Sequence, residues 1–218
     1  MSARVSTRIS IAWSGAEPIE DTDTLVLTID GYSLDLRVFL EGLDKGSMDW
    51  STVAHVGEIE GSTKEKPKLR WDHIIDNRPE TEMPDQGVFD TLSNGDVTET
   101  GTMFNPKTNL YEPYVETWRR KQLPSRTPYF VVASQQKDVQ SYIGRVGDYA
   151  LGLAKDARGD YYAWRDQLEQ GHWKRIYEFG QVNKYLPQLP SEVSQDWAKG
   201  GSTILGGVTW DIKVVGQL

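Results

Sequence analysis

The chain of 218 residues is long enough for one large β domain or for two domains of about a hundred residues, each with its own core. Its 24 Lys and Arg against 32 Asp and Glu give a formal net charge of −8, which argues against nucleic-acid binding because a basic stripe is needed to neutralise phosphates. The absence of cysteine excludes disulfides, thiolate nucleophiles and cysteine-ligated zinc, and is typical of a reducing compartment.

The start of the chain, MSARVSTRIS, contains two arginines but no apolar stretch of the kind found in a secretory signal. The longest apolar runs, such as YFVVA at 129–133, are far too short to cross a bilayer. The sequence therefore predicts a cytoplasmic protein without membrane insertion, and nuclear access stays open.

Alternating apolar and polar residues, typical of β-strands, dominate the first half of the chain. The run TLVLTIDGYSLDLRVF at 24–39 alternates on both sides of an Asp-Gly pair at 30–31, where a two-residue hairpin turn favours residues that tolerate positive φ. Further on, KLRWDHIID at 68–76 places Trp71 and His73 on the same strand face. These runs predict three strands.

A second hairpin is predicted before the middle of the chain. The run GDVTETGTMF at 95–104 places Glu99 and Met103 on one face, and an Asn-Pro pair then leads the chain back into YVETWRR at 114–120. In the returning strand, Glu116 shares a face with two aromatic residues, which is an unusual place for a carboxylate.

The charged segment RRKQLPSRTP at 119–128 has two prolines and no periodicity, so it predicts a boundary between domains 1–122 and 128–218. Further strands are expected in YFVVAS, SYIGRVGDYALGLAKD, DYYAWRD and HWKRIYEFG. The segment PSEVSQDWAKG at 190–200 predicts one short helix near the C-terminus, capped by Ser191. Many short strands with one late helix predict an all-β fold of two small antiparallel barrels or curved sheets.

Several motifs resemble the fungal Hri-type family, which is named for interaction with a casein-kinase-I-type kinase. They include ISIAW, MDWSTVAHVG, LRWDHIIDNR, DVTETG, YVETWRR, YIGRVGDYALG, FGQVNKYLP and KGGSTILGGVTWDI, in this order over nearly the whole chain. The resemblance implies two tandem antiparallel, lipocalin-like (calycin-type) β-barrel domains. It implies no settled chemistry, so function has to be argued from the site itself.

Residues on a barrel strand alternate between lumen and solvent, so the aromatic face of YVETWRR is expected to carry Glu116 into the lumen of the first barrel. Burial raises the pKa of an unpaired carboxyl, and such a group can act as a general acid or base. The candidate catalytic residues are Glu116, Glu99 and His73, and the candidate substrate-binding residues are Trp71, Trp118, Tyr114 and Met103. The alternative is structural, because ion-pair networks that tie strands together also perturb pKa values.

Neither a metal nor a cofactor is predicted. The three histidines, His55, His73 and His172, are widely separated, and Asp72 and Asp76 are expected on the strand face opposite His73, which disfavours a shared metal. The sequence has no P-loop, no G-x-S-x-G elbow and no G-x-G-x-x-G that opens a helix.

Three functions remain open. In the first, the barrel binds a hydrophobic small molecule and acts on it without a cofactor, as a cyclase, isomerase or pericyclase of fungal specialised metabolism, because such chemistry needs a shaped cavity and one or two proton-handling groups. In the second, the protein is a non-catalytic adaptor that interacts with a casein-kinase-I-type kinase. In the third, the barrel binds a ligand without changing it.

Overall fold

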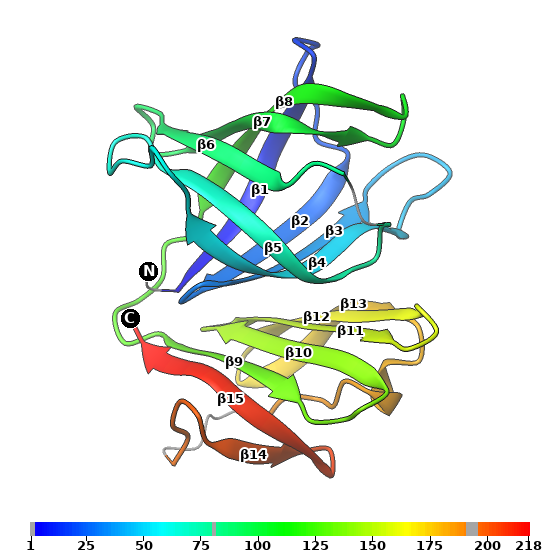
Figure 1. Ribbon diagram of the computed structural model, residues 1–218. Coiled ribbons are helices and arrows are strands. Elements are labelled where there is room, and N and C mark those ends of the chain that lie inside the picture. The colour runs from blue at the N-terminus through cyan, green and yellow to red at the C-terminus, as the bar shows by residue number, and fades with distance from the viewer. Residues whose placement is uncertain (1–2, 80–81, 191–195) are drawn as a thin grey trace.

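A computed structural model describes residues 3–79, 82–190 and 196–218 and contains two antiparallel β-sheets. The first sheet consists of β1 (Arg4–Trp13), β2 (Thr22–Ile29), β3 (Tyr32–Phe39), β4 (Met48–Glu58), β5 (Lys68–Asp76), β6 (Asp85–Thr91), β7 (Val97–Asn105) and β8 (Leu110–Arg120). The second consists of β9 (Pro128–Ser134), β10 (Val139–Val146), β11 (Tyr149–Asp156), β12 (Tyr161–Glu169), β13 (His172–Phe179), β14 (Ser202–Leu205) and β15 (Val208–Gln217). Figure 1 shows the first sheet stacked on the second, and the all-β class is confirmed.

The first sheet closes into a barrel of eight strands in sequential order, because β1 pairs antiparallel with β8. Its strands alternate as expected, and on β2 and β3 the apolar face points out of the barrel. On β2, Val26 and Thr28 line the interior of the barrel, whereas Leu25 and Leu27 are fully buried in a core shared with the second sheet. The closed barrel expected for the first half is confirmed, with charged and polar side chains in its lumen.

The second sheet is open, with the order β13-β12-β11-β10-β9-β15-β14, so a second barrel is not confirmed. Among the described residues, its outer strands β13 and β14 are not paired with each other, and β14 has only four residues. The chain between these two strands instead packs Val182, Leu186 and Leu189 into a core with Trp164 and Trp210. Side chains of this connection therefore fill the space that a second lumen would occupy.

The predicted helix at 190–200 is wrong where the structure describes it. Its residues 191–195 lie outside the described residues, and 196–200 form turns and irregular structure rather than helix. The reason is the pairing of the backbone: the N–H of Gly200 donates to the carbonyl of Ile212, at 2.9 Å, in place of an intrahelical bond. The helical structure in the described ranges is one 3-10 turn, Val182–Lys184, and no helix there has the length and apolarity needed to span a membrane.

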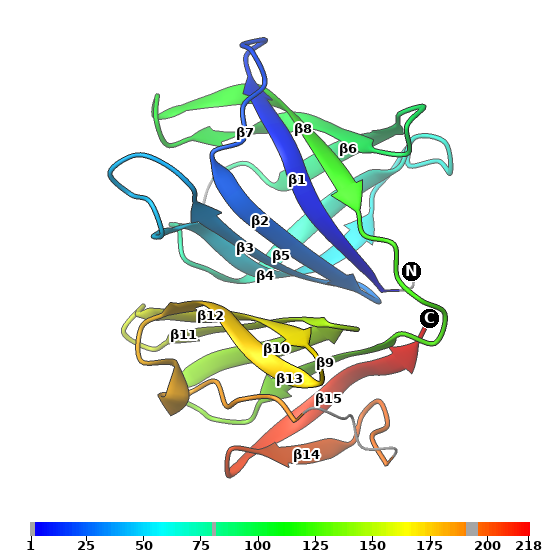
Figure 2. The same ribbon diagram turned by 180° about the vertical axis from the view of Figure 1, so that it is seen from behind.

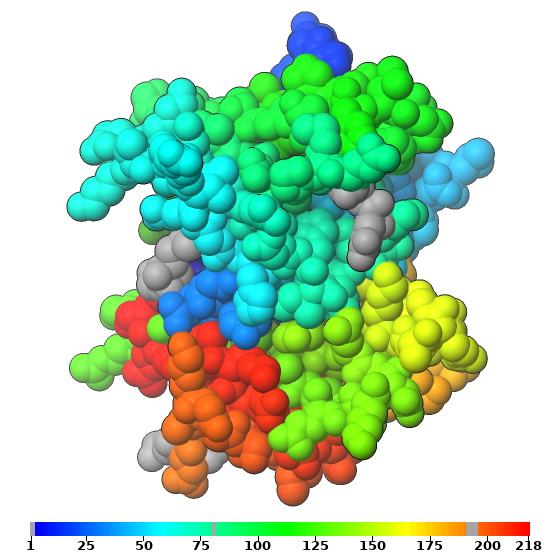
Figure 3. Space-filling model, in the orientation of Figure 1, coloured from blue at the N-terminus to red at the C-terminus, as the bar shows by residue number. Residues whose placement is uncertain are grey.

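The two sheets are in direct contact, as the space-filling view in Figure 3 shows. One apolar core joins them, with Leu34 and Leu36 from the barrel packed in the same cluster as Leu151 and Leu153 of the second sheet. The first sheet ends at Arg120 and the second begins at Pro128, and Figure 2 shows the connection on the same side of the molecule as both termini. The division into domains 1–122 and 128–218 stays a prediction.

Candidate functional site

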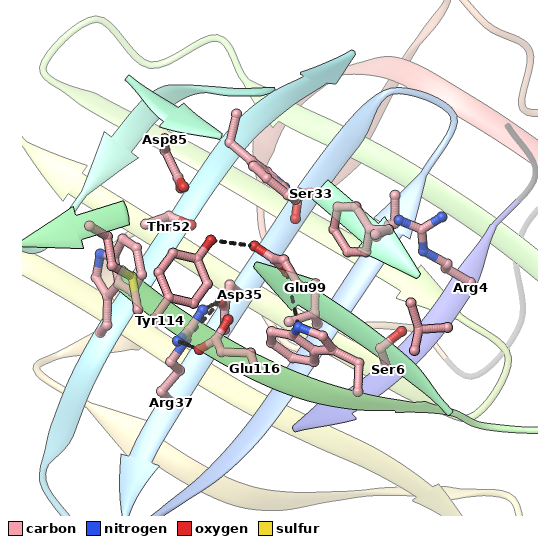
Figure 4. A pocket seen from close by; sticks show the side chains of 18 of the residues that line it. Arg4, Ser6, Ser33, Asp35, Arg37, Thr52, Asp85, Glu99, Tyr114 and Glu116 are labelled. Atoms are coloured by element: carbon pink, nitrogen blue, oxygen red, sulfur yellow. Dashed lines mark hydrogen bonds and ion pairs between the residues drawn. The ribbon is translucent and has the colours of Figure 1, made fainter. Parts of the chain in front are cut away.

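All eight strands of the barrel contribute side chains to a cavity of about 70 Å³ in its lumen, which Figure 4 shows from close by. Seven charged residues line this cavity: Arg4, Arg37, Arg120, Asp35, Asp85, Glu99 and Glu116. Buried charges are costly unless they are paired, so the partners of each group decide what the cavity can do.

Glu116 is fully paired with basic side chains. Its Oε1 accepts hydrogen bonds from Nη1 of Arg8 at 2.7 Å and from Nη1 of Arg37 at 2.8 Å, and all three side chains are buried. Burial alone would raise the pKa of Glu116, but the charges of Arg37 and Arg8 outweigh this effect and lower it. Glu116 is therefore ionised at neutral pH and ties β8 to β1 and β3.

Glu99 lies in the same lumen without such a partner. Its Oε1 accepts a hydrogen bond from the hydroxyl of Tyr114 at 2.7 Å, and its Oε2 accepts one from Nε1 of Trp118 at 2.9 Å. Burial and the charge of Glu116 raise the pKa of Glu99 to about 8, although the bond from Tyr114 acts in the opposite direction. Glu99 can therefore hold or release a proton near neutral pH, which is the requirement for a general acid or base.

Two strand glycines leave room for this carboxyl and its partner. A Cβ at Gly87 would lie 2.7 Å from Oε1 of Glu99, and a Cβ at Gly101 would lie 2.9 Å from the hydroxyl of Tyr114. Both distances are shorter than a van der Waals contact, so any larger residue would displace the side chain beside it. Gly101, the glycine of the DVTETG motif, therefore leaves space for the hydroxyl of Tyr114 at the candidate site.

The prediction that His73 lies in the lumen is wrong. His73 lies outside it, on the groove at the mouth of the barrel, with Nδ1 at 2.8 Å from Oδ2 of Asp76 and Nε2 at 3.0 Å from Oδ2 of Asp85. Burial lowers the pKa of His73, but the hydrogen bonds to Asp76 and Asp85 outweigh it and raise the pKa to about 9. The imidazole lies between two carboxylates there, and a catalytic role for it stays a prediction.

A β-bulge in β5 explains why Asp76 reaches His73. Val53 pairs with Ile75 and Ala54 pairs with His73, so Ile74 is an extra residue in β5. An extra residue reverses the alternation of faces, and this brings Asp76 to the same side as His73 rather than the opposite one. Among the described residues, no group of three or more His, Cys, Asp or Glu side chains is arranged to hold a metal ion.

The four predicted substrate-binding residues line the cavity: Trp71, Trp118, Tyr114 and Met103. Two of them, Trp71 and Met103, together with Trp50 and Asp85, also line a groove of about 1310 Å³ on the outside of the barrel. We call these four shared residues, where the cavity and the groove adjoin, the mouth of the lumen. From there the groove continues along β5 and residues 82–84 to the second sheet. Their roles in binding stay predictions.

Most of the other residues that line the lumen were not predicted from the sequence, and three of them are polar residues on β3. Ser33, Asp35 and Arg37 alternate with apolar residues in SLDLRV and line the cavity. This alternation is visible in the sequence, but alternation alone does not say which face of the strand lines the lumen. The signal lay in the polar residues at every second position.

The closed barrel, its charged lumen and the packed second sheet define an all-β protein with an internal polar cavity. The chain belongs to the Protein HRI1 family, which it matches over residues 4–213, and this confirms the family predicted from the motifs. No curated protein matches the sequence. The crystal structure of the uncharacterized protein YLR301w from Saccharomyces cerevisiae is similar, with a TM-score of 0.82 and 16% identity over 99% of this chain and 100% of that chain. At this identity the similarity shows the fold alone.

Proposed function

We propose that the barrel binds a small organic molecule in its lumen and that Glu99 exchanges a proton with it without a cofactor. The observation that carries this proposal is a buried carboxyl with a pKa of about 8, positioned by Tyr114 and Trp118 in a cavity that adjoins a groove. A positioned acid–base group of matched pKa contributes about 10²- to 10⁴-fold to a reaction rate.

The size of the lumen limits the ligand. Small-molecule sites usually measure about 300 to 1,000 Å³, whereas this cavity has a volume of about 70 Å³. The ligand therefore has only a few non-hydrogen atoms, or it inserts one end into the lumen while the rest occupies the groove beyond Trp71 and Met103. Its inner end is polar, because the lining is charged, so the hydrophobic molecule expected from the sequence fits only the aromatic mouth.

Each lumen group has a distinct part in this proposal. Below its pKa of about 8 Glu99 donates a proton, and above it the carboxylate accepts one. The pKa of Tyr114 is raised well above its usual value by burial and by the charge of Glu99, so its hydroxyl remains a neutral donor. Oδ1 of Asp35 is buried without a hydrogen-bond partner among the described residues and can accept a hydroxyl or amine proton of the ligand. Isomerisation and cyclisation need no more than such positioning and proton exchange.

Replacing Glu99 by Gln tests this function, because the amide keeps the size of the side chain and loses the exchangeable proton. The wild type and the variant are screened against a library of small metabolites by ligand-observed NMR, and each bound compound is then followed for conversion. We expect conversion by the wild type only, with unchanged conversion in Glu58→Gln, an exposed residue at the end of β4. Equal conversion by Glu99→Gln and the wild type would refute the proposal.

The second candidate, an adaptor for a casein-kinase-I-type kinase, is favoured by the groove itself. At about 1310 Å³ it is far larger than the lumen, residues of both sheets line it, and it includes the exposed side chain of Met83. Titration of the protein with a purified kinase domain of this type tests the idea. Binding that is lost in Met83→Asp and kept in Glu99→Gln would favour the adaptor over the enzyme.

A further inference from the structure

One end of the lumen carries five polar side chains that make no side-chain hydrogen bond or ion pair with any described residue. They are Arg4, Ser6, Thr28, Ser33 and Arg120, and all five line the cavity. Three of them are hydroxyl residues that are nearly completely buried, so their donors are directed to the interior rather than to bulk solvent.

The strand register brings these side chains together. Arg4 on β1 pairs with Thr28 on β2, which in turn pairs with Ser33 on β3, so these three residues form a row across adjacent strands. On the other side of β1, Ser6 pairs with Arg120 of β8. Directly paired residues on one face have Cβ atoms about 4.5 to 5.5 Å apart. Figure 4 shows Arg4 and Ser6 at one side of the cavity and Glu99 between them and Tyr114.

This end of the cavity is positive. Burial and the neighbouring charge of Arg120 lower the pKa of Arg4 to about 10, so the guanidinium is still charged at neutral pH. No described carboxylate lies within ion-pair distance of Arg4, and Glu99, with which it interacts through its charge, is mainly protonated at that pH. A third lumen arginine, Arg37, is already paired with Asp35 and Glu116.

The lining also has an apolar part. Val97 and Trp118 pair with each other next to the Glu99–Glu116 pair, Phe89 pairs with Glu99, and Val26 pairs with Ser6. We propose that the ligand of the lumen is a small monocarboxylate, whose carboxylate group accepts hydrogen bonds from Arg4 and the neighbouring hydroxyls while its apolar part lies along this part of the lining towards Glu99. Guanidinium and hydroxyl donors match the acceptor geometry of a carboxylate, and the charge-assisted bonds are the strong ones. A dianion fits less well, because its second charge would be offset only by the exposed Arg120.

This inference rests on the proposed function, since it names the ligand class of the same lumen. It is tested by calorimetric titration of the full chain with acetate and propionate, and separately with inorganic phosphate. We expect propionate to bind with a 1:1 ratio, Arg4→Met to weaken binding at least about tenfold, and Lys64→Met, a change of an exposed charge, to have no effect. Removing Arg4 breaks no ion pair, so the variant should fold, and Ser33→Ala serves as a second, milder change with a smaller loss.

The outcomes separate the two proposals. Propionate binding that is lost in Arg4→Met and kept in Glu99→Gln supports the carboxylate end whether or not Glu99 is an acid–base group. If the wild type binds neither carboxylate, or if Arg4→Met binds propionate as well as the wild type, the carboxylate assignment is overturned and the proposed function can still stand. Phosphate binding tighter than propionate binding would also overturn it.

Discussion

Glu99 and Glu116 lie opposite each other on β7 and β8, and their surroundings hold them in opposite protonation states at neutral pH. Two like charges directly opposite on one sheet face destabilise it. In the barrel, Arg8 and Arg37 pair with the carboxylate of Glu116. The carboxyl of Glu99 instead accepts hydrogen bonds from neutral donors, so the two groups do not carry like charges. Pairs of acidic groups whose pKa values are separated in this way are typical of acid–base sites.

The first prediction concerns the paired carboxylate. Glu116→Gln leaves two buried guanidinium groups without their shared anion, so we expect a loss of about 3 to 5 kcal/mol in the free energy of unfolding. Glu99→Gln removes a group that is mainly neutral in the folded protein but ionised in the unfolded chain, so we expect this variant to be more stable than the wild type at pH 7. Urea unfolding followed by tryptophan fluorescence measures both variants. Equal losses in the two would contradict the assignment of opposite charge states.

The second prediction is a pH dependence caused by Glu99. Its pKa in the folded protein, about 8, is raised above the ordinary value of 4.5, so its contribution to stability is complete below pH 4.5 and is lost as the pH rises through 8. Between pH 4.5 and pH 8 the folded state binds one more proton than the unfolded state. The free energy of unfolding therefore falls by up to about 1.4 kcal/mol for each pH unit in this range. The Glu99→Gln variant lacks this decrease, so its stability relative to the wild type should increase from pH 5 to pH 8. A constant difference between the two proteins over this range would show that Glu99 has an ordinary pKa.

The third prediction uses the close approach of backbone and carboxyl at Gly87. In Gly87→Ala the new methyl group would meet the side chain of Glu99 at 2.7 Å, so the carboxyl must move away from Tyr114 and Trp118. We expect altered chemical shifts of the Trp118 indole proton and a destabilisation of about 1 to 3 kcal/mol, as for other overpacked sites. The matched control is Gly57→Ala, where the added methyl group meets no atom within 4 Å. An unchanged Trp118 signal in Gly87→Ala would place Glu99 elsewhere.

The fourth prediction concerns the connection between the sheets. Residues 122–126 belong to no strand and most of them are exposed, so limited proteolysis should cleave there early. Because Leu34 and Leu36 share a core with Leu151 and Leu153, we expect both fragments to remain together after cleavage. Gel filtration followed by denaturing electrophoresis measures this. Separation of the fragments in native buffer would show that the two parts are independent domains.

Local alternation predicted the strands and the inward face of YVETWRR, because Tyr114, Glu116 and Trp118 are buried while Val115 and Arg119 are exposed. It could not predict the bulge at Ile74, since one extra residue leaves no mark in a period-two pattern and yet reverses every later face.

Pairings between residues that are distant in the sequence could not be predicted from it either. The arginine partners of Glu116 lie 108 and 79 residues away in the chain, and only the closure of the barrel brings them to it. Whether the second sheet closes depends on β13 and β14, which are distant in sequence, and on the side chains of the connection between them. Sequence patterns describe single strands well, but these pairings belong to the folded chain as a whole.

The last prediction concerns the mouth of the lumen, where Asp85 lines the cavity and also pairs with His73. The folded pKa of His73, about 9, is raised above the ordinary 6.5, so its contribution to stability is complete below pH 6.5 and is lost as the pH rises through 9. We expect His73→Asn to be less stable than the wild type by about 1 to 2 kcal/mol at pH 6, since the site is partly open to solvent, and by much less at pH 10. Thermal unfolding over this pH range measures the difference, and Asp72→Asn, an exposed change on the same strand, serves as the control. If the difference stayed constant from pH 6 to pH 10, His73 would not be charged in the folded protein, and the ion pairs at the mouth would not form.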